Sequence, residues 1–345
     1  MRRALILAFC ALTLLAACGD QGSLAPFTDS RIPPGLEQRF YPPEGWTWGL
    51  VKVGPDPPAR YGVSAPARRP RADVLILSGY GETAESWFET VRALNGKGYV
   101  VWVLEPVGQG GSGRYALPRD LGYATSLAPD AGLARAMAGM VIRRRPLFVL
   151  AGRTAAPAAI EALGSGLVAN GVILSAPVLQ PDPSAPYDRA DLMRRVWLGP
   201  LLAPGSAPWR RDGPDDRALG LTHDAARGRV GLQWQTANPD LRMGGPSWGW
   251  RAAFADAARQ ADLATPRLTA KVLILQPDTG MGSARALCRR LVKCTLQPFG
   301  PAGPALQLEV DKVRQAWLSA VVAFIESDIA RFSPPPPTAR LAPEG

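Results

Sequence analysis

Two side chains in the second half of the sequence have the types needed for acyl transfer, in which a hydroxyl attacks an ester while an imidazole accepts its proton. Ser247 stands in Gly-Pro-Ser-Trp-Gly, which matches the Gly-x-Ser-x-Gly pattern of a serine nucleophile. His223 is the only histidine among 345 residues, and a site rearranged around Ser247, His223 and Asp278 would supply a nucleophile, a base and an acid. No apolar strand precedes Ser247, and a histidine beside an acid is more often a packing pair, so structural roles are favoured for both residues.

Other site chemistries find little support in the sequence. No spacing of cysteine and histidine indicates zinc, and periodicity places no pair of carboxylates together. The glycines of residues 108–113 satisfy a dinucleotide-binding pattern after an apolar strand, but the residues that follow them make a poor helix start. We therefore expect no metal and no cofactor.

The first residues predict the compartment. Arg2 and Arg3 precede the apolar segment 4–17, which is too short to span a membrane and indicates an export signal peptide over residues 1–17. The end of this segment, Leu-Ala-Ala-Cys-Gly, resembles the lipobox of bacterial lipoproteins. The resemblance implies cleavage before Cys18 and acylation of that cysteine. We expect a lipid-anchored protein of the bacterial cell envelope, held to the membrane through its N-terminus, with a periplasmic folded domain.

The charge balance bears on the partners. Without the two arginines of the signal, the chain has 37 basic and 29 acidic residues, which gives a formal net charge of +8. No dense basic run or helix stripe is present, so we expect no nucleic-acid partner. Anionic lipid head groups are a natural partner for an envelope protein, although a dispersed, merely solubilising charge is the favoured interpretation. The sequence names no protein partner.

Two cysteines would remain unmodified in the mature chain, Cys288 and Cys294. An oxidising compartment permits them to form a disulfide. One falls late on a predicted helix and the other at the start of a predicted strand, so a disulfide and two buried thiols both remain open.

The chain divides into a tail at each end and a folded middle. Residues 18–45 mix Pro, Gly, Ser and charge without periodicity, which predicts a flexible tether. Residues 333–345 begin with a run of prolines and are predicted to be a disordered tail. The domain is expected over residues 46–332, with an insertion or cap over about 180–265 that is rich in Pro, Trp, Arg and Gly.

Within the domain, short apolar runs alternate with segments of helical periodicity, which predicts an α/β fold whose mostly parallel sheet has helices on both faces. The predicted strands are 72–78, 99–104, 146–151, 171–175, 271–275 and 294–297, and the predicted helices are 83–97, 127–144, 155–163, 283–291 and 307–329.

This plan and several local sequences resemble the α/β-hydrolase superfamily. Residues 78–82 are similar to its His-Gly-x-Gly oxyanion loop, residues 104–112 to its Asp-x-Arg-Gly-x-Gly-x-Ser turn, and residues 174–177 to its Leu-Ser-Ala-Pro strand end. The cap stretches 221–224, 238–240 and 244–250 resemble the lysophospholipase and monoacylglycerol-lipase-like branch, of the serine aminopeptidase S33 type. The resemblance covers roughly residues 70–330.

The catalytic positions implied by this resemblance depart from the pattern. Thr154 stands at the expected nucleophile position and Ala156 replaces a glycine, in a turn that a β-branched residue resists. The family's histidine should fall within residues 300–307, which contain none. Asp278 is the nearest candidate acid, although an ungapped reading places Gly280 at the family's aspartate.

The resemblance therefore implies a degenerate catalytic triad. Backbone amides of Tyr80 and Ala155 would remain as oxyanion-like donors, because backbone donors need no particular side chain. We expect an envelope lipoprotein that is a pseudoenzyme and binds a lipid, an acyl ligand or a protein partner. One alternative is an active carboxylic-ester hydrolase, of the lysophospholipase or monoacylglycerol lipase type, with a rearranged site. Another is a structural or assembly protein with a filled pocket.

Overall fold

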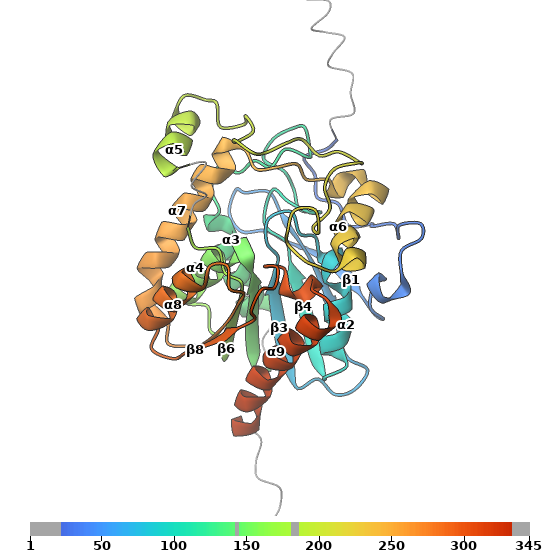
Figure 1. Ribbon diagram of the computed structural model, residues 1–345, viewed down its shortest axis with the longest axis vertical. Coiled ribbons are helices and arrows are strands. Elements are labelled where there is room, and N and C mark those ends of the chain that lie inside the picture. Colours follow the sequence, from blue (N-terminus) through green and yellow to red (C-terminus); the bar gives the residue numbers. More distant parts are fainter. Residues whose placement is uncertain (1–21, 142–144, 181–185, 333–345) are drawn as a thin grey trace, which may run out of the picture.

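Short runs of apolar residues form the strands at the centre of the molecule. The computed structural model describes residues 22–141, 145–180 and 186–332. In these residues eight strands make one sheet, in the order β1-β2-β4-β3-β5-β6-β7-β8 (Figure 1). The strands are β1 (Thr47–Val51), β2 (Ala59–Ser64), β3 (Ala72–Leu77), β4 (Tyr99–Leu104), β5 (Leu147–Gly152), β6 (Gly171–Ser175), β7 (Lys271–Gln276) and β8 (Cys294–Pro298).

The six strands from β4 to β8 in the sheet order are parallel, and β2 pairs antiparallel with both of its neighbours, β1 and β4. Every residue of β3 and β5 is buried, as expected for parallel strands covered on both faces. The α/β-hydrolase arrangement expected from the sequence is thereby confirmed, and two further strands, β1 and β2, extend one side of the sheet beyond the six that were predicted.

Helices cover both faces of the sheet. One face packs against α2 (Phe88–Asn95) and α9 (Asp311–Phe332), which bury Val91, Trp317 and Ile325 against the strands. The other face packs against α3 (Ala128–Ala136), α4 (Ala156–Gly164) and α8 (Met281–Arg290). Within the described residues, no helix has both the length and the apolar character needed to cross a membrane.

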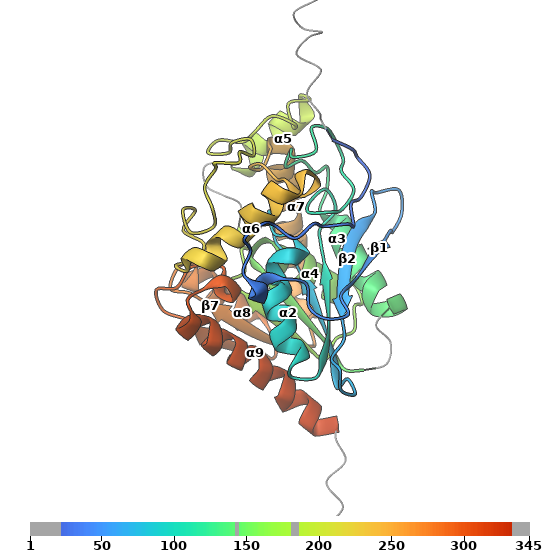
Figure 2. The same ribbon diagram turned by 90° about the vertical axis from the view of Figure 1, so that its right-hand side faces the viewer.

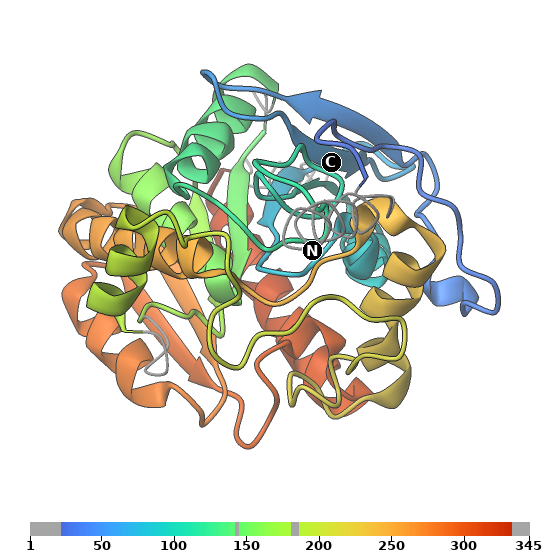
Figure 3. The same cartoon turned by 90° about the horizontal axis from the view of Figure 1, so that it is seen from above.

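The cap lies between β6 and β7. It contains α5 (Tyr187–Arg195), α6 (Ala225–Ala237) and α7 (Trp248–Ala264). Figure 3 looks down on this end of the molecule, where the yellow-green to orange cap segments run across it. Arg227 of α6 is bonded to Glu89 of α2 at 2.8 and 2.9 Å and to Asp311 at the start of α9 at 2.7 Å, so the cap is tied to helices of the core.

The expected flexible tether over residues 18–45 is corrected for residues 22–45, which lie on the domain. The Phe27 amide donates to the Gly111 carbonyl at 2.7 Å, and Arg31 exchanges two backbone hydrogen bonds with the Asn238 side chain at 2.7 and 2.9 Å. Leu36 and Phe40 are buried in one apolar cluster. Isolated apolar residues among prolines give no periodic pattern, and the sequence therefore did not predict that residues 22–45 pack on the domain. The predicted signal peptide, Cys18 and the tail 333–345 lie outside the described residues.

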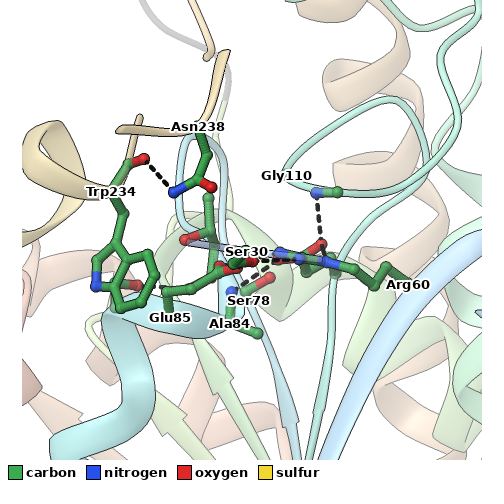
Figure 4. A network of polar contacts seen from close by, with 12 residues as sticks. Ser30, Arg60, Ser78, Ala84, Glu85, Gly110, Trp234 and Asn238 are labelled. Atoms are coloured by element: carbon green, nitrogen blue, oxygen red, sulfur yellow. Dashed lines mark hydrogen bonds and ion pairs between the residues drawn. The ribbon is translucent and has the colours of Figure 1, made fainter. Parts of the chain in front are cut away.

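A buried ion network joins the N-terminal strands to the loops above the sheet (Figure 4). The guanidinium of Arg60 donates to Glu105 at 2.6 and 2.8 Å and to Glu85 at 2.9 Å, and all three side chains are fully buried. Burial alone would lower the pKa of Arg60, but the two carboxylates outweigh burial and raise that pKa above its ordinary value. Glu105 also accepts from the Ala84 and Gly111 amides at 2.7 Å each, so the network fixes the loops that follow β3 and β4.

Cys288 and Cys294 are joined in a disulfide, with their Cα atoms 5.5 Å apart. The bond links the end of α8 to the first residue of β8. Of the two alternatives left open by the sequence, the structure therefore has the disulfide.

Candidate functional site

The turn between β5 and α4 is where a hydrolase of this fold presents its nucleophile. Arg153 is the residue of this turn with a left-handed backbone, φ +43°. Its carbonyl accepts from the Val178 amide at 3.0 Å, which helps to hold this conformation. The expected nucleophile position at Thr154 is thus corrected by one residue, because the strand extends through Gly152 and the bend begins directly after it.

Thr154 has a different role in the turn. Its Oγ1 accepts a hydrogen bond from the Tyr80 amide at 2.7 Å, and Tyr80 is one of the two backbone donors expected for an oxyanion. With Arg153 at the bend, the other expected donor moves from the Ala155 amide to that of Thr154. The Tyr80 amide is therefore occupied by a hydroxyl of the same chain, in the place where a hydrolase would bind the developing oxyanion.

A polar cluster surrounds Arg153. Its Nη1 lies 3.6 Å from Oε1 of Glu82, whose other carboxylate oxygen accepts from the Gly79 amide at 2.8 Å and from Trp87 Nε1 at 3.3 Å. Gln307 donates its side-chain amide to Glu82 at 3.4 Å. The segment 300–307, where the family's histidine was expected, thus contributes an amide group to this cluster. An amide cannot take a proton from a nucleophile, so the cluster lacks a base of that kind.

The residues of the rearranged site lie in separate environments. Ser247 is fully buried as the N-cap of α7, where its Oγ accepts from the Trp250 amide at 3.2 Å. His223 is 63% exposed and its Nδ1 lies 2.7 Å from the buried carboxylate of Glu309. Asp278 is exposed, and its amide donates to the Gly300 carbonyl at 2.8 Å. Among the contacts of the described residues, no hydrogen bond joins any two of Ser247, His223 and Asp278.

A cavity of about 390 Å³ lies between the cap and the loops that follow β3 and β5. Its core-side wall includes Tyr80, Glu82 and Arg153, and its cap-side wall includes Asp216 and residues 205–210. Burial, together with nearby Glu82 and against the effect of Arg153, raises the pKa of Asp216 to about 6. A second cavity of about 30 Å³ lies beneath Thr154, which is room for only one or two water molecules.

Several of these residues were missed by the sequence interpretation. Arg153, Glu82 and Gln307 are brought together from loops more than 70 residues apart in the chain, and Glu309 lies 86 residues from its partner His223. Of these residues, only Arg153 could have been found from the sequence, because it directly precedes the expected nucleophile position Thr154. The described residues contain no group of three or more His, Cys, Asp or Glu side chains arranged to hold a metal ion.

Solved structures with known activities share this fold. A monoglyceride lipase of Saccharomyces cerevisiae, solved as a soluble variant with a substrate analogue, aligns with a TM-score of 0.60 at 15% identity, over 88% of this chain and 98% of that chain. A monoacylglycerol lipase of Paleococcus ferrophilus gives a TM-score of 0.61 at 17% identity, over 78% and 99%. A carboxyl esterase of Bacillus coagulans, in complex with glycerol, gives 0.59 at 15% identity, over 82% and 99%.

At such identities these structures establish the fold alone, and no functionally curated protein shows significant sequence similarity to the chain. A sequence profile gives the family. The profile of the family described as serine aminopeptidase, S33, matches residues 68–284, which is more than half of the chain. This protein therefore belongs to the serine aminopeptidase S33 family of α/β-hydrolase-fold proteins.

Proposed function

We propose that this chain is a lipid-anchored envelope protein that binds an acyl-containing ligand in its cap cavity and does not hydrolyse it. The observation that carries the proposal is Arg153 at the strained turn. A guanidinium remains charged and only donates hydrogen bonds, so it can hold a polar or anionic group but cannot attack a carbonyl carbon.

The surroundings of Arg153 support the absence of turnover. Arg153 pairs with Glu82, whose carboxylate also binds Gln307, and it interacts electrostatically with Asp216. The chain's single imidazole is exposed and bound to Glu309. The Tyr80 amide is occupied by Thr154. Losing a nucleophile or a base typically lowers turnover by about a millionfold, and this site lacks both at the expected place.

The larger cavity supports a binding role over that of an assembly protein with a filled pocket. Its volume of about 390 Å³ lies within the range of small-molecule sites, roughly 300–1,000 Å³. Its lining combines apolar residues, among them Trp209, Leu232 and Met243, with the polar cluster at Arg153. The proteins named above act on monoacylglycerols and carboxylic esters by their names, and we extend that ligand class to this chain.

Anchoring is the second part of the proposal. It rests on the lipobox-like sequence that ends in Cys18, after a signal-like apolar segment. More than one acyl chain on that cysteine would give stable membrane attachment, because each buried methylene contributes about 0.8 kcal/mol.

Native mass spectrometry of the detergent-extracted full chain tests the binding role. We expect one copurified acyl lipid per chain, and we expect Gly231→Phe to remove it. Gly231 lies on α6 and lines the cavity, so a ring at this position occupies the ligand's space. The matched control is Gly282→Phe, on α8, where a Cβ meets nothing within 4 Å and the cavity is not involved. A folded wild-type chain that carries no lipid, or equal lipid in both variants, would overturn the binding role.

A further inference from the structure

The cap exposes an apolar patch directly after α5. We define the patch as residues 192–201, whose exposed members are Leu192 (57%), Val196 (47%), Trp197 (90%), Leu198 (42%) and Leu201 (53%). Single exposed apolar residues are ordinary on protein surfaces, but so many within ten consecutive residues mark an interaction surface.

The backbone of the patch is held in place. The Leu198 amide donates to Met193 at 2.9 Å, and the amides of Trp248 and Gly249 on α7 donate to the carbonyls of Leu201 and Gly199 at 2.9 and 2.7 Å. Trp197 has φ +66°, a left-handed conformation that is strained for a residue with a side chain. The tryptophan is therefore presented to solvent by a defined structure, at an energetic cost.

The described chain begins at the same end of the molecule. Arg119, in the loop between β4 and α3, donates to the carbonyls of Ser23 and Ala25 at 2.5 and 2.6 Å. These hydrogen bonds hold the first described residues on that loop. Figures 1 and 2 both place this dark blue start of the chain at the upper end, as they do α5, whereas α9 ends at the lower end. Cys18 precedes Gly22 by four residues, which span at most about 14 Å when fully extended.

We propose that the patch inserts into the lipid surface to which Cys18 is anchored, so that the cap faces the bilayer. The inference rests on the proposed acylation of Cys18, because that anchor and the reach of the chain bring the bilayer to this end of the domain. Tryptophan and leucine are the side chains expected at a membrane interface, where the indole ring lies at the head-group level.

The proposed docking also connects the membrane to the cavity. The cap loop that carries Leu201 continues into residues 205–210, which line the 390 Å³ cavity. The apolar patch and one wall of the cavity are therefore parts of the same cap segment.

Bromolipid quenching tests the docking. The acylated full chain is reconstituted in phosphatidylcholine liposomes with brominated acyl chains, which quench the fluorescence of tryptophans in contact with them. We expect quenching of the wild-type chain and loss of most of it in Trp197→Phe. The matched control adds Val292→Trp to Trp197→Phe. Val292 is 77% exposed and precedes β8, so it lies at the amino edge of the sheet, away from the cap. We expect no quenching there.

The outcomes separate docking from anchoring. Intact mass without acyl groups on Cys18 overturns the anchoring, and the docking with it. An acylated, liposome-bound chain whose quenching is the same with and without Trp197 overturns the docking alone. Absence of quenching together with a dimer in sedimentation also overturns it, and assigns the patch to a second copy of the chain.

Discussion

Removing the charge of Arg60 should cost more stability than any exposed ion pair of this protein can contribute. Arg60→Gln breaks three hydrogen bonds to carboxylates, of 2.6, 2.8 and 2.9 Å, and the stacking of the guanidinium at 4.0 Å from the Trp48 ring centroid. Glu85 and Glu105 are then left fully buried without their cation. Removing one partner of a buried pair typically costs about 3–5 kcal/mol, which is a large fraction of the 5–15 kcal/mol that stabilises a domain.

The structure offers a matched control in Arg71, which pairs with Glu326 through two hydrogen bonds but at 49% and 35% side-chain exposure. Solvent screening limits such a pair to about 0–1 kcal/mol, so Arg71→Gln should change little. Arg60→Lys keeps the charge and loses the fork geometry, and it provides an intermediate variant if Arg60→Gln does not fold.

Urea unfolding at pH 7.5, followed by tryptophan fluorescence, measures all three variants against the wild-type chain. Added salt should leave the Arg60→Gln defect nearly unchanged, because buried charges are weakly screened. A loss of stability for Arg60→Gln within 1 kcal/mol of that for Arg71→Gln would show that the buried network contributes no more than an exposed ion pair.

Three further perturbations have defined outcomes. Burial raises the pKa of Asp130 to about 7, above the ordinary value near 3.9. The protonated Asp130 carboxyl therefore adds its full contribution to the free energy of unfolding below about pH 4, and this contribution is lost as the pH rises through 7. Asp130→Asn should therefore stabilise the protein by about 1–2 kcal/mol at pH 8 and not at pH 4 in urea titrations, and an equal effect at both pH values would exclude this cause. Thr154→Val leaves the Tyr80 amide without its hydrogen-bond acceptor and should lower the free energy of unfolding by about 1–3 kcal/mol, whereas Thr154→Ser should lower it less. Equal losses of stability in thermal melts would rule out the hydrogen bond as the reason. Replacing Cys288 and Cys294 together by serine opens a loop of only six residues, so about 2 kcal/mol should be lost, and a reductant should lower the stability of the wild-type chain alone.

The fold followed from the sequence because its central strands are buried on both faces and are read as continuous apolar runs. The β3 and β5 runs gave this signal without ambiguity. β1 and β2 did not, because they are short strands in antiparallel pairings, with partly exposed residues, in a region rich in proline and glycine. Residues 22–45 were missed for a similar reason, since their contacts with the domain are backbone hydrogen bonds and isolated apolar side chains.

The candidate site was only partly predictable. The loop at Tyr80 and the turn after β5 were found from their positions behind apolar strands, but the sequence could not show which residue adopts the left-handed backbone. That residue is Arg153, one position before Thr154. The pairs His223 with Glu309 and Arg153 with Glu82 depend on loops that meet only in the folded chain, which no spacing in the sequence reports.

Whether the chain hydrolyses an acyl ester is the most direct test of its proposed role. The acylated full chain is incubated with a fluorophosphonate probe and, separately, with monoacylglycerol and lysophospholipid, beside its Arg153→Ala and Ser247→Ala variants. We predict no stoichiometric labelling and the same background release of fatty acid from all three proteins. Labelling of one site per chain, or a wild-type release that Ser247→Ala or Arg153→Ala abolishes, would contradict the account.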